Sequence, residues 1–250
     1  MTTVPIRSIP AGMTASIEAA TGVAPQAVIR RYYLAMAAPF AVDLVSMIVY
    51  ALMHQQRAFL ASTVLMSAIF LLGVVGVGAR FLIRPVSRFI RGDVSFSDIE
   101  SVLTHLPRRS AALVACCYVP MLALRMLSHL FGIQFGAQPE DPDWPDLIAS
   151  FVVGTGFNVL LTFFVVSAYL DQLCEYLFLS RGVNIGVFHG RFRRKVAVAV
   201  LFVAFAGIIL LSADIASYDG ARLIREATTD VVSTVIGTLF MFFWITHALS

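Results

Sequence analysis

Two ionisable side chains lie within long apolar stretches of the chain, where a charge is costly. Asp43 lies 12 residues after Arg31, and Arg125 lies 16 residues after Arg109. On insertion scales, a charge at the centre of a membrane helix costs about 2.5–3.5 kcal/mol. We therefore expect both side chains to face the interior of a helix bundle, where a carboxylate and a guanidinium group can pair or bind a polar ligand.

A proline precedes each of these two charges, and an amide lies in a third apolar stretch. Pro39 comes before Asp43, Pro120 comes before Arg125, and Asn158 is the amide. Because proline removes a backbone hydrogen bond, it kinks a helix. We expect two kinked helices that frame a cavity, with Arg125 as the anion-recognising group of a ligand site and Asp43 as its partner. A structural ion pair that fixes the helix register explains the same residues.

Other chemistry-bearing residues form no recognisable catalytic or metal-binding pattern. The cysteines, Cys116, Cys117 and Cys174, lack the spacing of a metal site. A bis-histidine haem would need two imidazoles at matched depth, which His54 and His129 permit. Single interfacial histidines are far commoner, so we expect no cofactor and no metal. With no phosphate-binding loop and no hydrolase motif, the sequence leaves open whether the protein is an enzyme.

The composition indicates which elements position these residues. Of the 250 residues, 59% are hydrophobic and only 13% are charged, and the mean hydropathy is +0.85. Soluble domains carry about 25% charged residues. The composition therefore predicts an all-α polytopic membrane protein and argues against a soluble enzyme or a nucleic-acid-binding domain.

Six apolar runs are long enough to cross a bilayer, which requires about 20 residues each. The first 29 residues contain three prolines and no such run, and they are interpreted as a cytoplasmic tail. Residues 30–250 then form a six-helix transmembrane domain, with three hairpins. The spans are expected at about 33–53, 59–83, 111–132, 147–170, 196–213 and 231–249.

The basic residues orient the predicted bundle. If both termini are cytoplasmic, the inner segments hold 14 of the 18 Lys and Arg residues. Cytoplasmic loops carry such an excess of positive charge, so we expect a multi-pass protein of the bacterial inner membrane with both termini inside. The inner residues are Arg7, Arg30, Arg31, Arg80, Arg84, Arg88, Arg91, Arg108, Arg109, Arg181, Arg191, Arg193, Arg194 and Lys195.

The inner and outer connections differ in character. The second span is expected to continue into the cytoplasm as a basic helix over 80–91 that stops at Gly92, and the fourth to continue through 171–180. A separate short helix is expected over 97–105, with Ser97 as its N-cap and Glu100 at the capping-box position. The last outer connection is expected to be a loop over residues 214–230.

Glycines in the second span predict close contact between helices. Gly73, Gly76 and Gly78 are closely spaced within one apolar run. Small residues allow helix backbones to approach each other in a membrane. This stretch is therefore interpreted as a packing surface rather than a phosphate-binding loop.

The inner hairpin carries a family resemblance. Residues 84–92 read RPVSRFIRG and residues 106–113 read LPRRSAAL. This pair resembles the R-P-x-x-x-x-x-R-G and L-P-x-R segment in six-span membrane domains of some bacterial class III adenylate cyclases and related sensor histidine kinases. The resemblance implies a sensory or regulatory domain that forms a homodimer and passes a ligand signal, such as a lipid or fatty acid, through the sixth helix to a cytoplasmic output domain.

The output domain expected from this resemblance does not follow within these residues. The sixth span ends at Ser250 with no basic cap, which favours a longer polypeptide. The alternative function is a transporter membrane subunit of the exporter type, whose short transverse helices would be 97–105 and 184–189. Membrane lipids are expected partners in either case, with the output domain in cis or a partner protein in trans.

Overall fold

The computed structural model describes residues 24–53, 64, 65, 68, 69, 72–131, 144–181 and 192–249. All regular structure in these ranges is helical, which confirms the all-α prediction for the described part. A short π-helix, η1, precedes α4. The elements are α2 (Pro25–Met53), η1 (Leu72–Gly78), α4 (Ala79–Arg91), α5 (Phe96–Phe131), α6 (Trp144–Arg181), α7 (Phe192–Ser217) and α8 (Gly220–Leu249).

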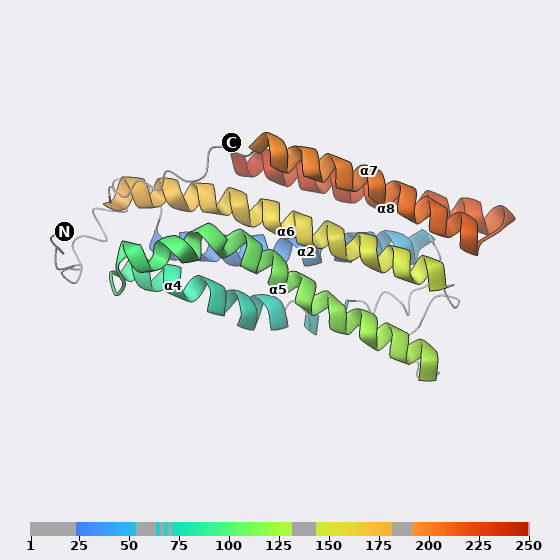
Figure 1. Cartoon of the computed structure of the whole chain (residues 1–250), viewed down its shortest axis with the longest axis horizontal. Helices are drawn as coiled ribbons and strands as arrows, with labels where there is room; N and C mark the ends of the chain where they lie inside the picture. The colour runs from blue at the N-terminus through green and yellow to red at the C-terminus, as the bar shows by residue number, and fades with distance from the viewer. Residues whose placement is uncertain are drawn as a thin grey trace.

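The helices lie side by side along the long axis of the molecule, with α6 at the centre (Figure 1). Helix α6 packs against α2, α5, α7 and α8, and α4 packs against α5 and α2. Helices α7 and α8 form a pair on one side of α6, and α4 and α5 lie on the other (Figure 1). The residues of α2, α5 and α6 therefore meet in the interior of the bundle.

The separate short helix expected over 97–105 is wrong, because α5 runs without interruption from Phe96 to Phe131. The helix continues through Pro107, although proline in a helix interior removes a hydrogen bond. Its buried stripe explains the continuity, because Ile99, Leu103, Leu106 and Val114 are each fully buried at helical spacing. A break at the proline would withdraw this stripe from the core. The N-cap prediction at Ser97 is also wrong, since this residue lies within the first turn.

The predicted end of the basic helix at Gly92 is confirmed. Gly92 has φ 94°, in the left-handed region. Its N–H donates to the carbonyl of Phe89 at 3.0 Å, and the N–H of Asp93 donates to that of Arg88 at 3.0 Å. This pair of bonds is a Schellman motif, which favours glycine because no Cβ opposes the positive φ. Likewise, α6 extends to Arg181, as the sequence predicts.

The loop expected over residues 214–230 is wrong. Helix α7 continues to Ser217 and α8 begins at Gly220, so only two residues separate them. The Tyr218 N–H donates to the Asp214 carbonyl at 2.8 Å, and the Arg222 guanidinium carbon lies 4.6 Å from the centre of the Tyr218 ring. These local contacts, together with the burial of Tyr218, stabilise helix where charge and polarity suggested a loop.

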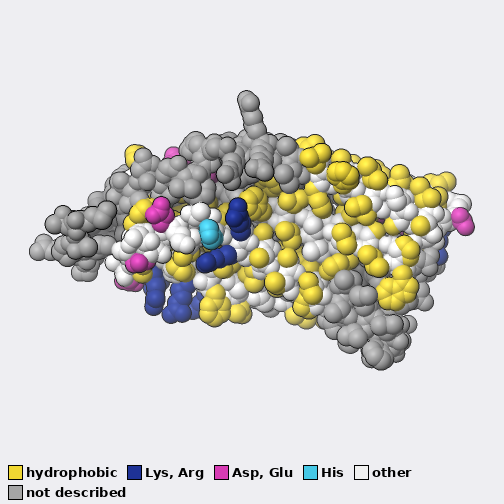
Figure 2. Space-filling model, viewed as in Figure 1, with side chains coloured by type: hydrophobic (Ala, Val, Ile, Leu, Met, Phe, Trp, Pro, Cys, Tyr) yellow, Lys and Arg dark blue, Asp and Glu magenta, His cyan; other side chains and the backbone are white. Residues whose placement is uncertain are grey.

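Two described helical segments are long and apolar enough to cross a membrane. They are Ile148–Ser180, with a mean hydropathy of 2.0, and Val200–Ser217, with 2.3. They overlap the fourth and fifth predicted spans, and the other four spans stay predictions. Apolar side chains cover the middle and one end of the visible face, while charged side chains gather at the end with the α4–α5 turn (Figure 2).

Glycines allow close approach between helices, mostly at positions other than those that the sequence predicted. A Cβ at Gly156 in α6 would lie 2.6 Å from the Phe202 ring of α7, and one at Gly237 in α8 would lie 3.0 Å from the Phe157 ring of α6. In the predicted glycine surface only Gly78 has such a neighbour, the side chain of Leu113 at 2.5 Å. A Cβ at Gly73 or Gly76 would meet no described atom within 4 Å, so the packing role of these two stays a prediction.

Candidate functional site

A polar cluster lies inside the bundle around the carboxylate of Asp43. The Tyr118 hydroxyl donates to Oδ2 of this carboxylate, and the Asn158 side-chain amide donates to Oδ1 at 2.6 Å. The residues come from α2, α5 and α6, respectively. The cluster therefore joins three helices that are distant in the sequence, and we call it the Asp43 cluster.

The surrounding residues hold both donors in place. Tyr118 is 7% exposed and Asn158 is 1% exposed. The Tyr118 ring stacks on Phe40, one turn before Asp43 in α2, with 6.4 Å between ring centres. In α6 the Thr162 hydroxyl donates to the backbone carbonyl of Asn158 at 2.7 Å. Because packing restrains the Tyr118 ring and burial restrains the Asn158 amide, their donors remain directed at the carboxylate.

The electrostatics of the Asp43 cluster rest on neutral donors. The two hydrogen-bond donors to the Asp43 carboxylate are uncharged, a phenol and an amide. Hydrogen bonds to a carboxylate are stronger than those between neutral groups because the acceptor is charged. Shielding from water strengthens them further. The Asn158 carbonyl oxygen, Oδ1, is buried and has no hydrogen-bond partner among the described residues. This oxygen is a free acceptor beside the carboxylate.

The remaining residues of the predicted site are placed only in part. Arg125 belongs to α5, but its side chain lies outside the described residues, so its pairing with Asp43 stays a prediction. Pro39 is buried in α2 and Pro120 is exposed in α5, and both helices continue through them. The kinks expected at Pro39 and Pro120 stay predictions.

Cofactor and metal chemistry gain no support from the described residues. His54 lies outside them, and so does the side chain of His129, so the haem alternative is untested. The described ranges contain no group of three or more His, Cys, Asp or Glu side chains that could hold a metal ion. The part of the site that is visible consists of hydrogen-bonding groups.

Sequence reasoning missed Tyr118. The signal available was general: a buried tyrosine hydroxyl in an apolar helix requires a hydrogen-bond partner. Pairing it with Asp43 depends on how α2 and α5 align, and no spacing within either helix reveals that alignment. The structure does bring together Asp43 and Asn158, two of the three residues that the sequence proposed for a ligand site.

The arrangement suits ligand binding better than covalent chemistry. Tyr118 and Asn158 act as donors, Asp43 accepts from both, and the described cluster contains no nucleophile paired with a base. A ligand that brings its own donor could take the place of either partner of the carboxylate. Such an exchange would alter the contacts among α2, α5 and α6.

Comparison with protein-family models, with curated proteins and with solved structures gives no match for this chain. The resemblance of residues 84–113 to cyclase membrane domains therefore stays a prediction.

Proposed function

We propose that the chain is a membrane-embedded sensory domain that reports the state of a bound ligand to a cytoplasmic output. In this proposal it crosses the bacterial inner membrane six times, with both termini in the cytoplasm. Membrane lipids surround it, a second copy forms a homodimer with it, and α8 carries the signal. The output is a domain in cis or a partner in trans.

The outer surface supports placement in a membrane. Soluble monomers expose only small contiguous apolar patches, whereas this chain exposes large apolar side chains on several helices. Lipid tails would cover such a surface without cost, and the charged end would meet water and headgroups. Examples more than half exposed are Leu34, Phe81, Val119, Val152, Leu201, Phe205, Ile208, Ile215, Val231, Leu239 and Phe243.

The sensory role is supported mainly by two contacts that adjacent residues of α6 make with different helices. Asn158 bonds to the Asp43 carboxylate, while its neighbour Phe157 faces Gly237 of α8 so closely that a Cβ added there would lie 3.0 Å from the Phe157 ring. In this proposal, a movement of α6 that changes the first contact also changes the second. The Asp43 cluster and the proposed output helix are coupled through one turn of α6.

The energies of these contacts suit a switch. Hydrogen bonds between helices in membranes contribute about 0.6 kcal/mol on average, with a maximum near 1.7. Coupling between two sites in proteins is typically about 1–3 kcal/mol, which changes an affinity roughly 5–150-fold. A ligand that exchanges one or two bonds of the Asp43 cluster therefore supplies free energy on the scale required. The shift equals the ligand's difference in affinity for the two states.

A reporter fusion tests this proposal. The full chain is joined after Ser250 to a class III adenylate cyclase catalytic domain, and cyclic AMP is measured in cells that lack their own cyclase. Asp43→Asn keeps the shape of the side chain but removes the charge that accepts both hydrogen bonds. We expect output to change by about fivefold or more. Gly237→Ala, which brings a methyl group against Phe157, is expected to change it as well.

Two matched variants serve as controls. Gly207→Ala makes the same change in α7 at a position where a Cβ meets no described atom within 4 Å. Leu34→Ala alters an exposed residue of α2 that is 53% accessible. Both are expected to leave output unchanged. If Asp43→Asn and Gly237→Ala give the same output as the parent at equal amounts of folded protein, the sensory role is contradicted.

The transporter alternative has less support. In that interpretation residues 97–105 form a transverse helix that contacts an ATPase. These residues are instead the first turns of the continuous helix α5. The second proposed transverse helix, at 184–189, lies outside the described residues.

A further inference from the structure

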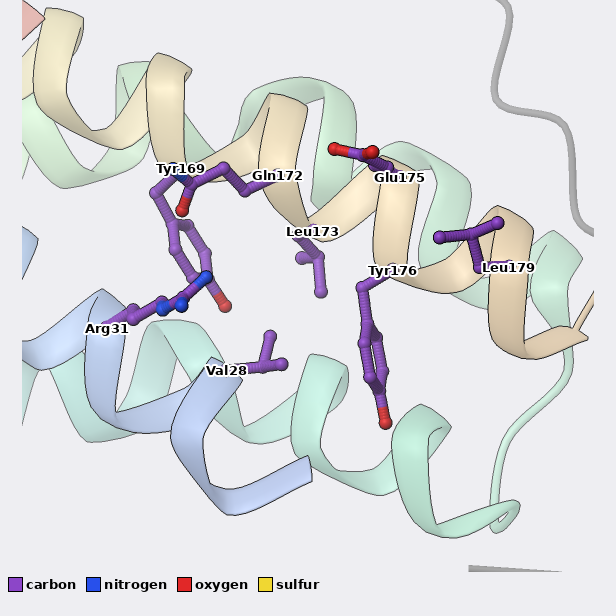
Figure 3. Close-up of a pocket in the computed structure, with 8 residues that line it drawn as sticks. All are labelled: Val28, Arg31, Tyr169, Gln172, Leu173, Glu175, Tyr176 and Leu179. Atoms are coloured by element: carbon purple, nitrogen blue, oxygen red, sulfur yellow. The ribbon is translucent and has the colours of Figure 1, made fainter. Parts of the chain in front are cut away.

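A second polar site lies between α2 and α6, away from the Asp43 cluster. A cavity of about 240 Å³ opens there, and eight residues of the two helices line it (Figure 3). From Asp43 to Arg31 along α2 is about 18 Å at 1.5 Å per residue, and from Asn158 to Tyr169 along α6 is about 16 Å. The cavity is therefore on the side of the Arg30–Arg31 pair, at the end where the sequence predicts the cytoplasmic interface.

Two donors that have no partner among the described residues meet at this cavity. Tyr169 is 4% exposed, and its hydroxyl has no hydrogen-bond partner among the described residues. Its ring lies against Tyr32, with 5.4 Å between ring centres, and the Tyr32 hydroxyl is already paired with Ser110 at 2.9 Å. The aromatic packing therefore fixes the Tyr169 ring but leaves its hydroxyl available.

Arg31 supplies the charge. Its side chain is exposed, it lines the same cavity, and no ion pair joins it to another described residue. Figure 3 shows the Tyr169 ring reaching from α6 toward α2, with its hydroxyl directed to the Arg31 side. The acidic residue of the lining, Glu175, lies on the side of α6 that is farther from α2 in the same view. A guanidinium group and a phenol directed to one space are suited to an anion that has several acceptor oxygens.

We propose that this cavity binds the phosphate ester of a glycerophospholipid headgroup, with Arg31 and Tyr169 as the two residues that hold the phosphate. The volume fits a headgroup phosphate, since it corresponds to about eight waters at roughly 30 Å³ each. Basic pockets between helices at the cytoplasmic side of a membrane bind anionic headgroups. The site rests on the proposed membrane placement but not on the sensory role of the Asp43 cluster.

Native mass spectrometry of the full chain in detergent tests the proposal. The probes are phosphatidylglycerol and a diacylglycerol with the same acyl chains. The diacylglycerol lacks the phosphate. We expect phosphatidylglycerol to bind at least tenfold more tightly. Arg31→Gln should weaken its binding about tenfold, as expected for the loss of a charge-assisted hydrogen bond. Tyr169→Phe should weaken it about threefold or more.

The neighbouring residue provides the matched control. Arg30→Gln removes the same charge from an exposed residue that does not line the cavity, and we expect a loss of less than threefold. Equal losses for Arg30→Gln and Arg31→Gln would show diffuse charge attraction and overturn the proposal. So would equal binding of the two lipids, or an unchanged affinity in Tyr169→Phe.

A further arm distinguishes the source of the phosphate. If glycerol 3-phosphate displaces phosphatidylglycerol, the cavity recognises the phosphate ester alone, and a free metabolite can occupy it. If it does not, the lipid tails are required and the ligand is the membrane lipid. Either result leaves the phosphate site intact. Because this assay has no output domain, its failure is separate from failure of the reporter fusion.

Discussion

The Asp43 cluster makes a specific prediction about three buried tyrosines. Tyr118, Tyr32 and Tyr169 are all at most 7% exposed, but their hydroxyls have different partners. That of Tyr118 donates to a carboxylate, that of Tyr32 pairs with the neutral Ser110 hydroxyl, and that of Tyr169 has no partner among the described residues. A change of tyrosine to phenylalanine removes one oxygen and leaves the ring in place. The three variants therefore compare hydrogen bonds at nearly constant packing.

The expected free energies of unfolding differ in size and in sign. A hydrogen bond to a charged group belongs at the upper end of the range for interhelical bonds in membranes, so Tyr118→Phe should destabilise the protein by about 1.5 kcal/mol. A neutral bond contributes about 0.5–1.5 kcal/mol, which sets the expected cost of Tyr32→Phe. An unsatisfied buried hydroxyl costs about 1–3 kcal/mol, so Tyr169→Phe should be neutral or stabilising when no lipid is bound.

Unfolding of the purified, delipidated protein in mixtures of mild detergent and SDS, followed by circular dichroism, gives these differences. The order of stability should be Tyr169→Phe, Tyr32→Phe and Tyr118→Phe, from the most to the least stable. A Tyr118→Phe protein as stable as the parent would contradict this prediction, because the partly buried Asp43 carboxylate would then not depend on its phenol donor. Equal losses in all three variants would refute it as well, since the effect would then not follow hydrogen bonding.

Two further predictions concern glycines and are checked by the same unfolding measurement. Gly156→Ala should destabilise the protein by about 1–3 kcal/mol, because the new Cβ overlaps the Phe202 ring. Gly154→Ala, two residues earlier in α6, has open space and should be neutral or up to about 1 kcal/mol stabilising through its helix propensity. Gly92→Ala should cost about 1–2 kcal/mol, since its φ of 94° is unfavourable for residues with a Cβ; equal stability of the Gly92→Ala protein and its parent would contradict this.

The sequence could predict features that depend on neighbouring residues. The end of α4 at Gly92 could be predicted because a left-handed helix cap favours glycine. The extension of α6 to Arg181 could be predicted from its long apolar run. Asp43 and Asn158 could be chosen as candidate site residues because polar groups are costly in apolar helices. These inferences needed no knowledge of which helices touch.

The sequence could not predict features that depend on packing between helices. Pro107 indicates a break, yet the buried stripe around Leu103 and Leu106 keeps α5 continuous. Tyr118 has no marked signal in the sequence, because its role arises from the alignment of α5 with α2. The charges between α7 and α8 suggest a loop, although contacts such as that of Arg222 with Tyr218 stabilise helix there.

Cysteine accessibility in intact cells tests the proposal that the chain crosses the membrane with its basic end inside. The turns at Ser95 and Asp219 lie at opposite ends of the molecule (Figure 1). After Cys116, Cys117 and Cys174 are replaced by serine, Ser95→Cys and Asp219→Cys are exposed separately to a membrane-impermeant maleimide in cells whose outer membrane has been permeabilised. We expect labelling of Asp219→Cys before the inner membrane is opened, and of Ser95→Cys only afterwards. Labelling of both from the outside, or the reverse order, would contradict it.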